Sequence, residues 1–273
     1  MSWASTSFTN IRKYTLSKTI ILLLLILGSA LFLLPLYWVL VAAISGGGGT
    51  FSVQFYPRRI DLSAFYKLIF KTPFPRWFLN SIIVATSTML IRLFLCSTAG
   101  YAFAKKKFPG STFLFWLLMS TMMIPAVINI IPMFFIGIKL GIIDTYLGMI
   151  VPVASYPFGI FLMRQFMITI PSDIMEAAII DGCSEIQVFY HAILPMAKPA
   201  LGALGILSFT QVWNAFVWQT IMTSSEKMRT LPVGISTLAV GQYTQDWATM
   251  LAGVTMAAVP MIAIFLFFQD YFV

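Results

Sequence analysis

Acidic side chains are scarce in this sequence, and four of the nine fall close together. Asp173, Glu176, Asp181 and Glu185 lie in a polar break between two apolar runs. Carboxylates in one segment can serve acid–base catalysis, bind a cation or pair with basic residues on another protein. The types and spacing of the residues around these acids indicate which of the three roles is the most plausible.

Catalysis by this chain is disfavoured by what the sequence lacks. It has no G-x-x-x-x-G-K-[ST] phosphate loop, no H-E-x-x-H zinc motif and no G-x-S-x-G nucleophile motif. The one histidine, His191, has no nucleophile motif near it. Cys96 and Cys183 are far apart in the sequence and form neither a disulfide framework nor a zinc site. We therefore expect no enzyme activity, metal or cofactor on this chain itself.

The acidic segment has the pattern of two short helices joined at a glycine. Ser172 is expected to cap the first helix, and Gly182 can take the left-handed conformation that ends it. Ser184 and Gln187 form an S-x-x-Q capping box for the second helix. Pro195 is expected to stop that helix because proline has no backbone N–H.

One face of the first helix is small, because Ala177 and Ala178 follow Glu176. Another protein surface can close onto such a face. The hairpin also carries apolar side chains, namely Ile174, Ile179, Ile186, Val188 and Phe189. The residues alone leave two interpretations open: an amphipathic loop that lies on its own bundle, and a docking element.

The composition places this loop beside a membrane. Of 273 residues, 59% are hydrophobic and 10% are charged, against about 25% charged in a soluble domain. The continuous apolar runs exclude disorder and disfavour a transmembrane barrel, whose strands alternate over about 10 residues. A spanning helix takes roughly 20 residues, so six spans fit this length. The predicted fold is an all-α, polytopic helical bundle with six transmembrane helices.

The six apolar runs divide the chain into spans and connecting segments. The predicted spans are Thr19–Ala43, Asn80–Ala104, Thr112–Ile136, Leu147–Met167, Pro199–Met222 and Trp247–Phe268. They leave an N-terminal segment, 1–18, an external segment, 44–78, and the polar loop, 168–196. Prolines inside spans three and four predict kinked helices, whose freed carbonyls neighbouring helices or water can satisfy.

Charge alone does not fix the orientation. The net charge is +8, and because the basic residues lie in clusters between spans, lipid headgroups are a better counter-charge than nucleic acid. With the N-terminus inside, the two sides carry eight basic residues each. The basic residues before span one and the Lys105–Lys107 turn favour a cytosolic N-terminus. Arg92 lies within span two, where carbonyls, water, a partner chain or snorkelling to the surface could satisfy it.

Polar groups inside spans are costly and often line a transport path. The candidates are Asn129, Tyr156, Asn214, Trp218 and Gln219. Aromatic faces beside amides suit a sugar ring, which has apolar faces and hydroxyl groups. Each residue singly is equally consistent with helix–helix hydrogen bonding.

The loop resembles the EAA loop of ABC importer membrane subunits. The residues that carry the resemblance are Glu176-Ala177-Ala178, Asp181-Gly182 and Leu194-Pro195. Asn80-Ser81, Phe108-Pro109-Gly110, Trp213-Asn214 and Leu231-Pro232-Val233-Gly234 extend it to the carbohydrate branch, nearest to the second permease of maltose-type importers. The short Gly-rich tail that usually follows Tyr-Phe-Val in that family is not in this sequence, and Gly46–Gly49 is unusual for it.

The resemblance implies a type I importer fold in the bacterial inner membrane, with both termini cytosolic. It implies that the loop is a coupling helix docked on an ATP-binding subunit. The implied partners are a second permease, two ATP-binding subunits that hold ATP and Mg, an extracytoplasmic solute-binding protein and membrane lipid. The implied cargo is an oligosaccharide or related carbohydrate.

Two alternative functions differ from this one in the residues that they require. A self-sufficient secondary transporter would need ion-coupling carboxylates within the spans, and none of the nine acids is placed mid-span. A membrane enzyme acting on lipid-linked sugar would need a catalytic cluster at the interface, where the four loop acids are the only cluster in the sequence.

Overall fold

The computed structural model describes residues 4–45, 55–57, 59–239 and 246–268, and in that part of the chain the regular structure is helical without strands. The longer helices are α1 (Ala4–Ile44), α2 (Ser63–Lys71), α3 (Phe74–Lys105), α4 (Ser111–Ser120), α5 (Ala126–Lys139), α7 (Pro157–Ile168), α8 (Asp173–Ile180), α11 (Lys198–Trp213), α13 (Leu231–Ala239) and α14 (Trp247–Phe268). The shorter ones are η1 (Thr121–Met123), α6 (Tyr146–Ile150), η2 (Val151–Val153), α9 (Glu185–Gln187), η3 (Val188–Ile193), α10 (Leu194–Met196), α12 (Val217–Met222) and η4 (Glu226–Met228). The predicted all-α fold is confirmed.

Three uninterrupted helices are long and apolar enough to cross a membrane: Lys18–Ile44, Phe74–Lys105 and Trp247–Leu266. They correspond to the predicted spans one, two and six. Three helix pairs bent at a short break are further candidates, each a broken span or a re-entrant loop: Ser111–Met123 with Ala126–Lys139, Tyr146–Val153 with Pro157–Ile168, and Glu185–Met196 with Lys198–Trp213. The described chain therefore has three candidate spans, and six if each bent pair is one span.

The bends are sharper than the kinks that the prolines predicted. Ile124, just before Pro125, is extended (φ −83°, ψ 119°), and the two halves of span three meet at 100°. Tyr156, just before Pro157, is also out of the helical region, and span four bends by 48°. The ring of a proline disfavours the helical conformation in the residue before it, which is consistent with the break at both of these positions.

The prediction of a continuous fifth span over Pro199–Met222 is wrong. Helix α11 ends at Trp213, and α12 begins only at Val217. The following stretch, predicted as a polar connection, contains helix α13, whose residues Leu231 and Leu238 are buried. Since α13 is only nine residues long, its hydrophobic pattern is too short to stand out from a loop.

Helix α3 is the central element, because it packs along both α7 and α11. Two glycines allow its close approach to α7. A Cβ atom on Gly100 would lie 2.6 Å from the Met163 Cβ, and one on Gly159 would lie 2.7 Å from the Cys96 Sγ. Small residues at such contacts let helix backbones approach closely in a membrane.

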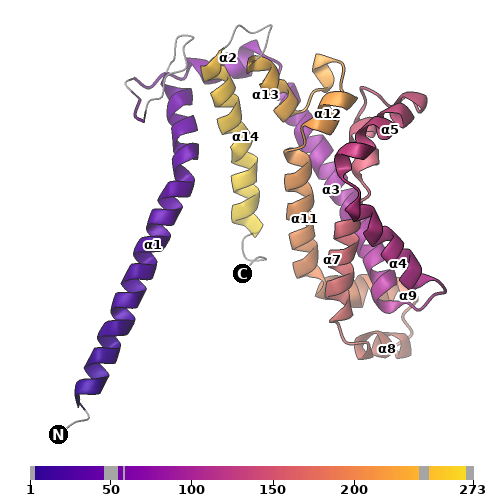
Figure 1. Ribbon diagram of the computed structural model, residues 1–273. Helices are drawn as coiled ribbons and strands as arrows, with labels where there is room; N and C mark the ends of the chain where they lie inside the picture. The colour runs from indigo at the N-terminus through magenta and orange to yellow at the C-terminus, as the bar shows by residue number, and fades with distance from the viewer. Residues whose placement is uncertain (1–3, 46–54, 58, 240–245, 269–273) are drawn as a thin grey trace.

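The helices have two distinct ends in Figure 1. Helix α8 and the first residues of α1 lie at one end, here called the α8 end, and α2, α12 and α13 lie at the opposite α2 end. Helix α1 packs against α14, but its apolar window has 0% of its residues buried within this chain. That surface must therefore face lipid or another polypeptide.

Candidate functional site

The loop at the α8 end folds as the predicted helical hairpin. Gly182 has a positive φ of 85° and its N–H donates to the Ile179 carbonyl at 3.0 Å, so it ends α8 as expected. The Ser184 N–H donates to Gln187 Oε1 at 2.7 Å, and the Gln187 N–H donates to Ser184 Oγ at 3.4 Å. The predicted capping box is confirmed.

Two details of the hairpin differ from the prediction. Ser172 has a helical backbone and makes no side-chain cap hydrogen bond; its carbonyl accepts from the Met175 and Glu176 N–H groups instead. Pro195 does not stop the second helix, which continues through the π-helix η3 and through α10 to Met196. Because the Leu194 N–H bonds five residues back, to the Phe189 carbonyl, the proline falls in the first turn of a new segment, where no N–H is needed.

The residues of the loop motif are mostly exposed. Glu176, Ala177, Asp181, Gly182 and Pro195 are exposed, and Ala178 and Leu194 are half-buried. The apolar side chains divide into two groups. Val188 and Phe189 are buried in the bundle, whereas Ile179, Ile180 and Ile186 are 50%, 84% and 70% exposed. An amphipathic loop that only lay on its own bundle would bury such side chains, so this face favours the docking interpretation.

The predicted path residues do not meet at one site. Asn129 is exposed on α5, Asn214 is exposed at the end of α11, and Tyr156 is half-buried at the break before α7. Trp218 and Gln219 lie on α12 and are only 8% and 1% exposed. Within the described residues, the Trp218 Nε1 and the Gln219 Oε1 are buried without a hydrogen-bond partner. Buried polar atoms of this kind are costly unless another group reaches them.

Asn214 lines a hollow of ≈ 620 Å³ between α11, α13 and α14. Its wall includes Trp213, whose Nε1 donates to the Ala257 carbonyl at 3.2 Å, and Ser236. The other four predicted path residues do not line it. The wall is otherwise apolar, so a sugar in this hollow would meet mainly hydrophobic side chains and few hydrogen-bonding groups.

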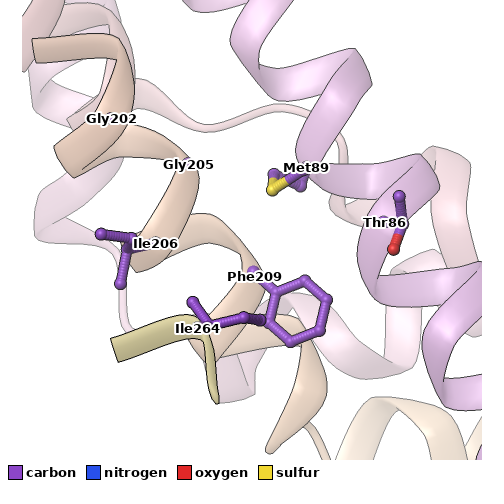
Figure 2. A pocket seen from close by; sticks show the side chains of 7 residues that line it. All are labelled: Thr86, Met89, Gly202, Gly205, Ile206, Phe209 and Ile264. Atoms are coloured by element: carbon purple, nitrogen blue, oxygen red, sulfur yellow. The ribbon is translucent and has the colours of Figure 1, made fainter. Parts of the chain in front are cut away.

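A smaller hollow of ≈ 230 Å³ lies between α3, α11 and α14 (Figure 2). Its lining is apolar except for Thr86, and Gly202 and Gly205 expose the backbone of α11 on one side. None of the predicted path residues contributes to it. A surface of this character suits an acyl chain or a neighbouring apolar side chain better than a carbohydrate.

Arg92 is the buried charge whose partner the sequence left open. It is 4% exposed, and its Nε and Nη2 donate to the Val153 carbonyl at 3.0 and 2.6 Å. Its Nη1 donates to Gln211 Oε1 at 2.7 Å, and its guanidinium lies 4.4 Å from the centre of the Tyr156 ring. Of the alternatives open from the sequence, satisfaction by a backbone carbonyl is the one observed. Gln211 was not identified from the sequence as a partner of Arg92, although a polar amide within a predicted span could have indicated it.

At the α2 end, buried polar side chains organise the loop before α13. Asn80 is fully buried, and its Nδ2 donates to the Lys227 and Arg229 carbonyls at 2.8 Å each. Asp144 accepts from the Ser224 and Ser225 N–H groups at 2.9 and 3.0 Å. Burial raises the pKa of Asp144, but these hydrogen bonds outweigh it, so that the pKa is lowered overall.

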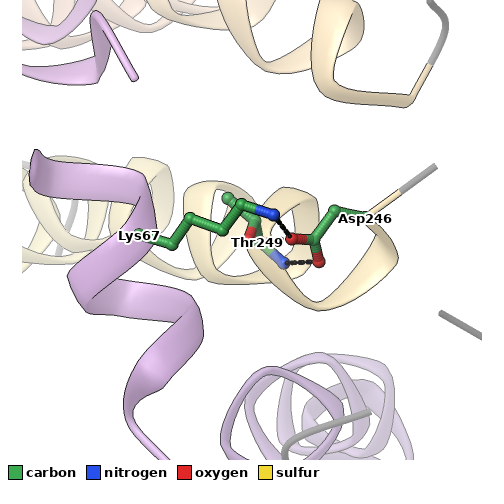
Figure 3. Close-up of polar contacts among 3 residues, drawn as sticks. All are labelled: Lys67, Asp246 and Thr249. Atoms are coloured by element: carbon green, nitrogen blue, oxygen red, sulfur yellow. Dashed lines mark hydrogen bonds and ion pairs between the residues drawn. The ribbon is translucent and has the colours of Figure 1, made fainter. Parts of the chain in front are cut away.

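An ion pair joins α2 to the start of α14 (Figure 3). The Lys67 Nζ lies 2.6 Å from Asp246 Oδ2, and the Thr249 N–H donates to Asp246 Oδ1 at 3.1 Å, which caps α14. Burial raises the pKa of Asp246, but the hydrogen bonds from Lys67 and Thr249 and the charge of Lys67 together outweigh it, so the pKa is lowered overall. The pair therefore fixes the α2 end of α14.

Comparisons with known proteins agree on one family. The family described as "Binding-protein-dependent transport system inner membrane component" matches residues 97–273. The arabinooligosaccharides transport system permease protein AraQ of Bacillus subtilis (strain 168) is 37% identical over 198 residues, 72% of this chain and 70% of that protein. The diacetylchitobiose uptake system permease protein NgcG of Streptomyces coelicolor (strain ATCC BAA-471 / A3(2) / M145) is 28% identical over 250 residues, 90% of this chain and 83% of that protein. A chain from the crystal structure of a bacterial ABC transporter involved in the import of the acidic polysaccharide alginate shares the fold, with a TM-score of 0.83, 24% identity, and coverage of 96% of this chain and 98% of that one.

Proposed function

Because the chain belongs to the family of binding-protein-dependent transport system inner membrane components, we propose that it couples ATP hydrolysis on partner subunits to oligosaccharide import through the exposed hairpin at the α8 end. The chain is a multi-pass membrane subunit of a carbohydrate ABC importer, a transport component and not a catalytic one. A second permease, two ATP-binding subunits that hold ATP and Mg, and a solute-binding protein complete the proposed assembly.

The single observation that carries the proposal is the exposed face of α8. It presents the Glu176 carboxylate next to Ala177 and to Ile180, which is 84% exposed. A carboxylate on a small-residue face with an uncovered apolar side chain suits a cleft with a basic residue and an apolar wall. The orientation follows from this role: the α8 end and the N-terminal end of α1 are cytosolic, and the α2 end is external.

Charge reversal at Glu176 tests the docking role. Glu176→Lys is expected to abolish ATP-driven uptake and the co-purification of the ATP-binding subunits, with the chain still inserted in the membrane. Asp61→Lys is the matched control, since Asp61 is an acid at the α2 end that accepts from the Ser63 N–H. Unchanged co-purification and uptake in the Glu176 variant would remove the docking proposal.

The proposed cargo is an oligosaccharide, supported by AraQ and NgcG, which are named for arabinooligosaccharide and diacetylchitobiose transport. Uptake of labelled arabinotriose, diacetylchitobiose and maltotriose by the assembled transporter in proteoliposomes, with its solute-binding protein, identifies the preferred sugar. Failure to import any carbohydrate offered, with intact ATP hydrolysis, would point to a cargo of another class.

Trp218 and Gln219 are the best-supported path residues, because their polar atoms are buried without partners among the described residues. Asn129, Tyr156 and Asn214 remain candidates: Asn129 is exposed, Tyr156 is half-buried, and Asn214 is exposed and lines the larger hollow. Trp218→Ala and Gln219→Ala are expected to alter the ranking of the three sugars or the rate of their uptake. Identical profiles in both variants would assign the two side chains to packing.

A further inference from the structure

Two lysines at the end of α3 contact the chain on both sides of helix α8. The Lys105 Nζ donates to the Ile170 carbonyl, three residues before α8 begins. Lys106 forms an ion pair with the carboxylate of Glu185, the first residue of the helix that follows α8. The lysine turn therefore contacts the chain as it enters and as it leaves α8.

An aromatic contact between α3 and η3 adds to these two lysine contacts. The rings of Tyr101 on α3 and Phe189 on η3 lie 5.0 Å apart, and both residues are buried. The Lys106 Nζ lies 5.5 Å from the centre of the Tyr101 ring, and the net effect of its surroundings is a raised pKa. Burial is the largest single influence and lowers the pKa of Lys106, but the hydrogen bond to Glu185 and the interactions with Tyr101 and the Glu185 charge together outweigh it. The α8 hairpin is thus held to α3 by apolar packing as well as by charge.

Helix α3 runs without a break from these lysine contacts with the α8 hairpin to the opposite end of the molecule. Its 32 residues span about 48 Å at the usual helical rise. At the α2 end the Trp77 Nε1 donates to the Glu226 carbonyl at 3.1 Å, and Asn80 donates to the Lys227 and Arg229 carbonyls. One rigid helix therefore connects the α8 hairpin to the loop before α13.

We propose that Lys105 and Lys106 are positioning residues for energy coupling: they fasten the α8 hairpin to α3, so that a displacement of α8 moves α3 instead of bending the loop. This inference rests on the proposed function, in which a partner subunit moves α8. An exposed ion pair contributes little to folding stability, and Glu185 is 68% exposed in this pair. The pair can nevertheless bias a two-state bundle, because only a differential free energy between the states is required.

A charge swap tests the Lys106–Glu185 ion pair, because the double variant should restore the attraction that each single variant removes. The variants are Lys106→Glu, Glu185→Lys and the double variant that carries both. Lys107→Glu is the matched control, because Lys107 is exposed in the same turn and has no ion pair among the described residues. Each is reconstituted with its partner permease, ATP-binding subunits and solute-binding protein. The readouts are co-purification of the ATP-binding subunits, MgATP hydrolysis, and sugar imported per ATP for whichever of arabinotriose, diacetylchitobiose and maltotriose the wild type imports fastest.

Each single reversal is expected to lower the sugar imported per ATP by about fivefold, the low end of coupling between two sites, with co-purification intact. The double variant is expected to recover most of the loss, and Lys107→Glu to match the wild type. Single variants that transport normally, or a double variant no better than either single one, would overturn the inference. Those outcomes leave the docking proposal standing, since that proposal fails only if Glu176→Lys keeps its ATP-binding subunits and its uptake.

Discussion

The hydrogen bonds of Asn80 predict how much a substitution at this position lowers the free energy of unfolding. The side chain is fully buried, donates to the Lys227 and Arg229 carbonyls at 2.8 Å each, and accepts from the Tyr146 hydroxyl at 2.7 Å. Asn80→Asp keeps the shape but replaces the two-donor nitrogen with an oxygen. The Lys227 and Arg229 carbonyls then share at most one donor from this side chain, and only if the new carboxyl is protonated, while Arg76 Nε still lies 3.4 Å from the Lys227 carbonyl.

The expected cost follows from what is left unpaired. Losing one hydrogen bond while leaving a buried acceptor unsatisfied costs about 1–3 kcal/mol, and a charged replacement costs more. We therefore expect Asn80→Asp to lower the free energy of unfolding by about 3 kcal/mol. Tyr146→Phe removes a single neutral hydrogen bond from the same amide and is expected to cost only about 1 kcal/mol.

The melting temperatures of the purified wild-type and variant chains in detergent, followed by tryptophan fluorescence, provide the comparison. The expected order, from highest to lowest, is wild type, Tyr146→Phe, Asn80→Asp. If Asn80→Asp melts at or above Tyr146→Phe, the amide does not hold the two carbonyls, and the account of how the α2 end is organised is wrong.

Two further predictions concern packing and pH. Gly234→Ala would place a Cβ atom 2.1 Å from the ring of Trp77, which is fully buried, so it should destabilise the fold by about 2–3 kcal/mol in the same melting assay. Gly28→Ala, with nothing within 4 Å of the new Cβ, should leave stability unchanged or raise it by up to about 1 kcal/mol. Equal melting temperatures for the two variants would contradict the contact between Gly234 and Trp77. Because the pKa of Asp246 is lowered in the folded chain, its pairing with Lys67 stabilises the fold above the unfolded pKa and is lost as the pH falls through the folded one. Asp246→Asn should therefore weaken the acid-induced fall in melting temperature, and a variant with an unchanged acid limb would exclude this pair as a contributor.

Local chemistry explains which parts of the candidate site the sequence could predict. The left-handed Gly182 and the Ser184–Gln187 capping box depend on residues three or four positions apart, so the sequence contains all the necessary information. The end of the second helix depended on more than Pro195 itself. A π-helical turn just before it shifts the hydrogen-bond register, and such a turn has no signature in residue type.

Tertiary packing explains what the sequence could not predict. Trp218 and Gln219 are polar residues within a predicted span, but α12 is separated from α11, so both are buried and do not line the hollow beside Asn214. Their place in a transport path stays a prediction. The position of a break between two short helices decides which way their side chains point. Helix α13 was missed for a different reason, since nine residues are too few for a hydrophobic pattern to distinguish it from a loop.

Arg92 shows how two costly features of the sequence satisfy each other. Val153 lies four residues before Pro157, so its carbonyl is the one that an N–H at position 157 would have satisfied in a continuous helix. Proline has no such donor, and Arg92 supplies two N–H groups to this carbonyl from α3. A buried arginine needs acceptors and a proline-broken span leaves one free, so an arginine in one span and a proline in another predict a contact that neither residue predicts alone.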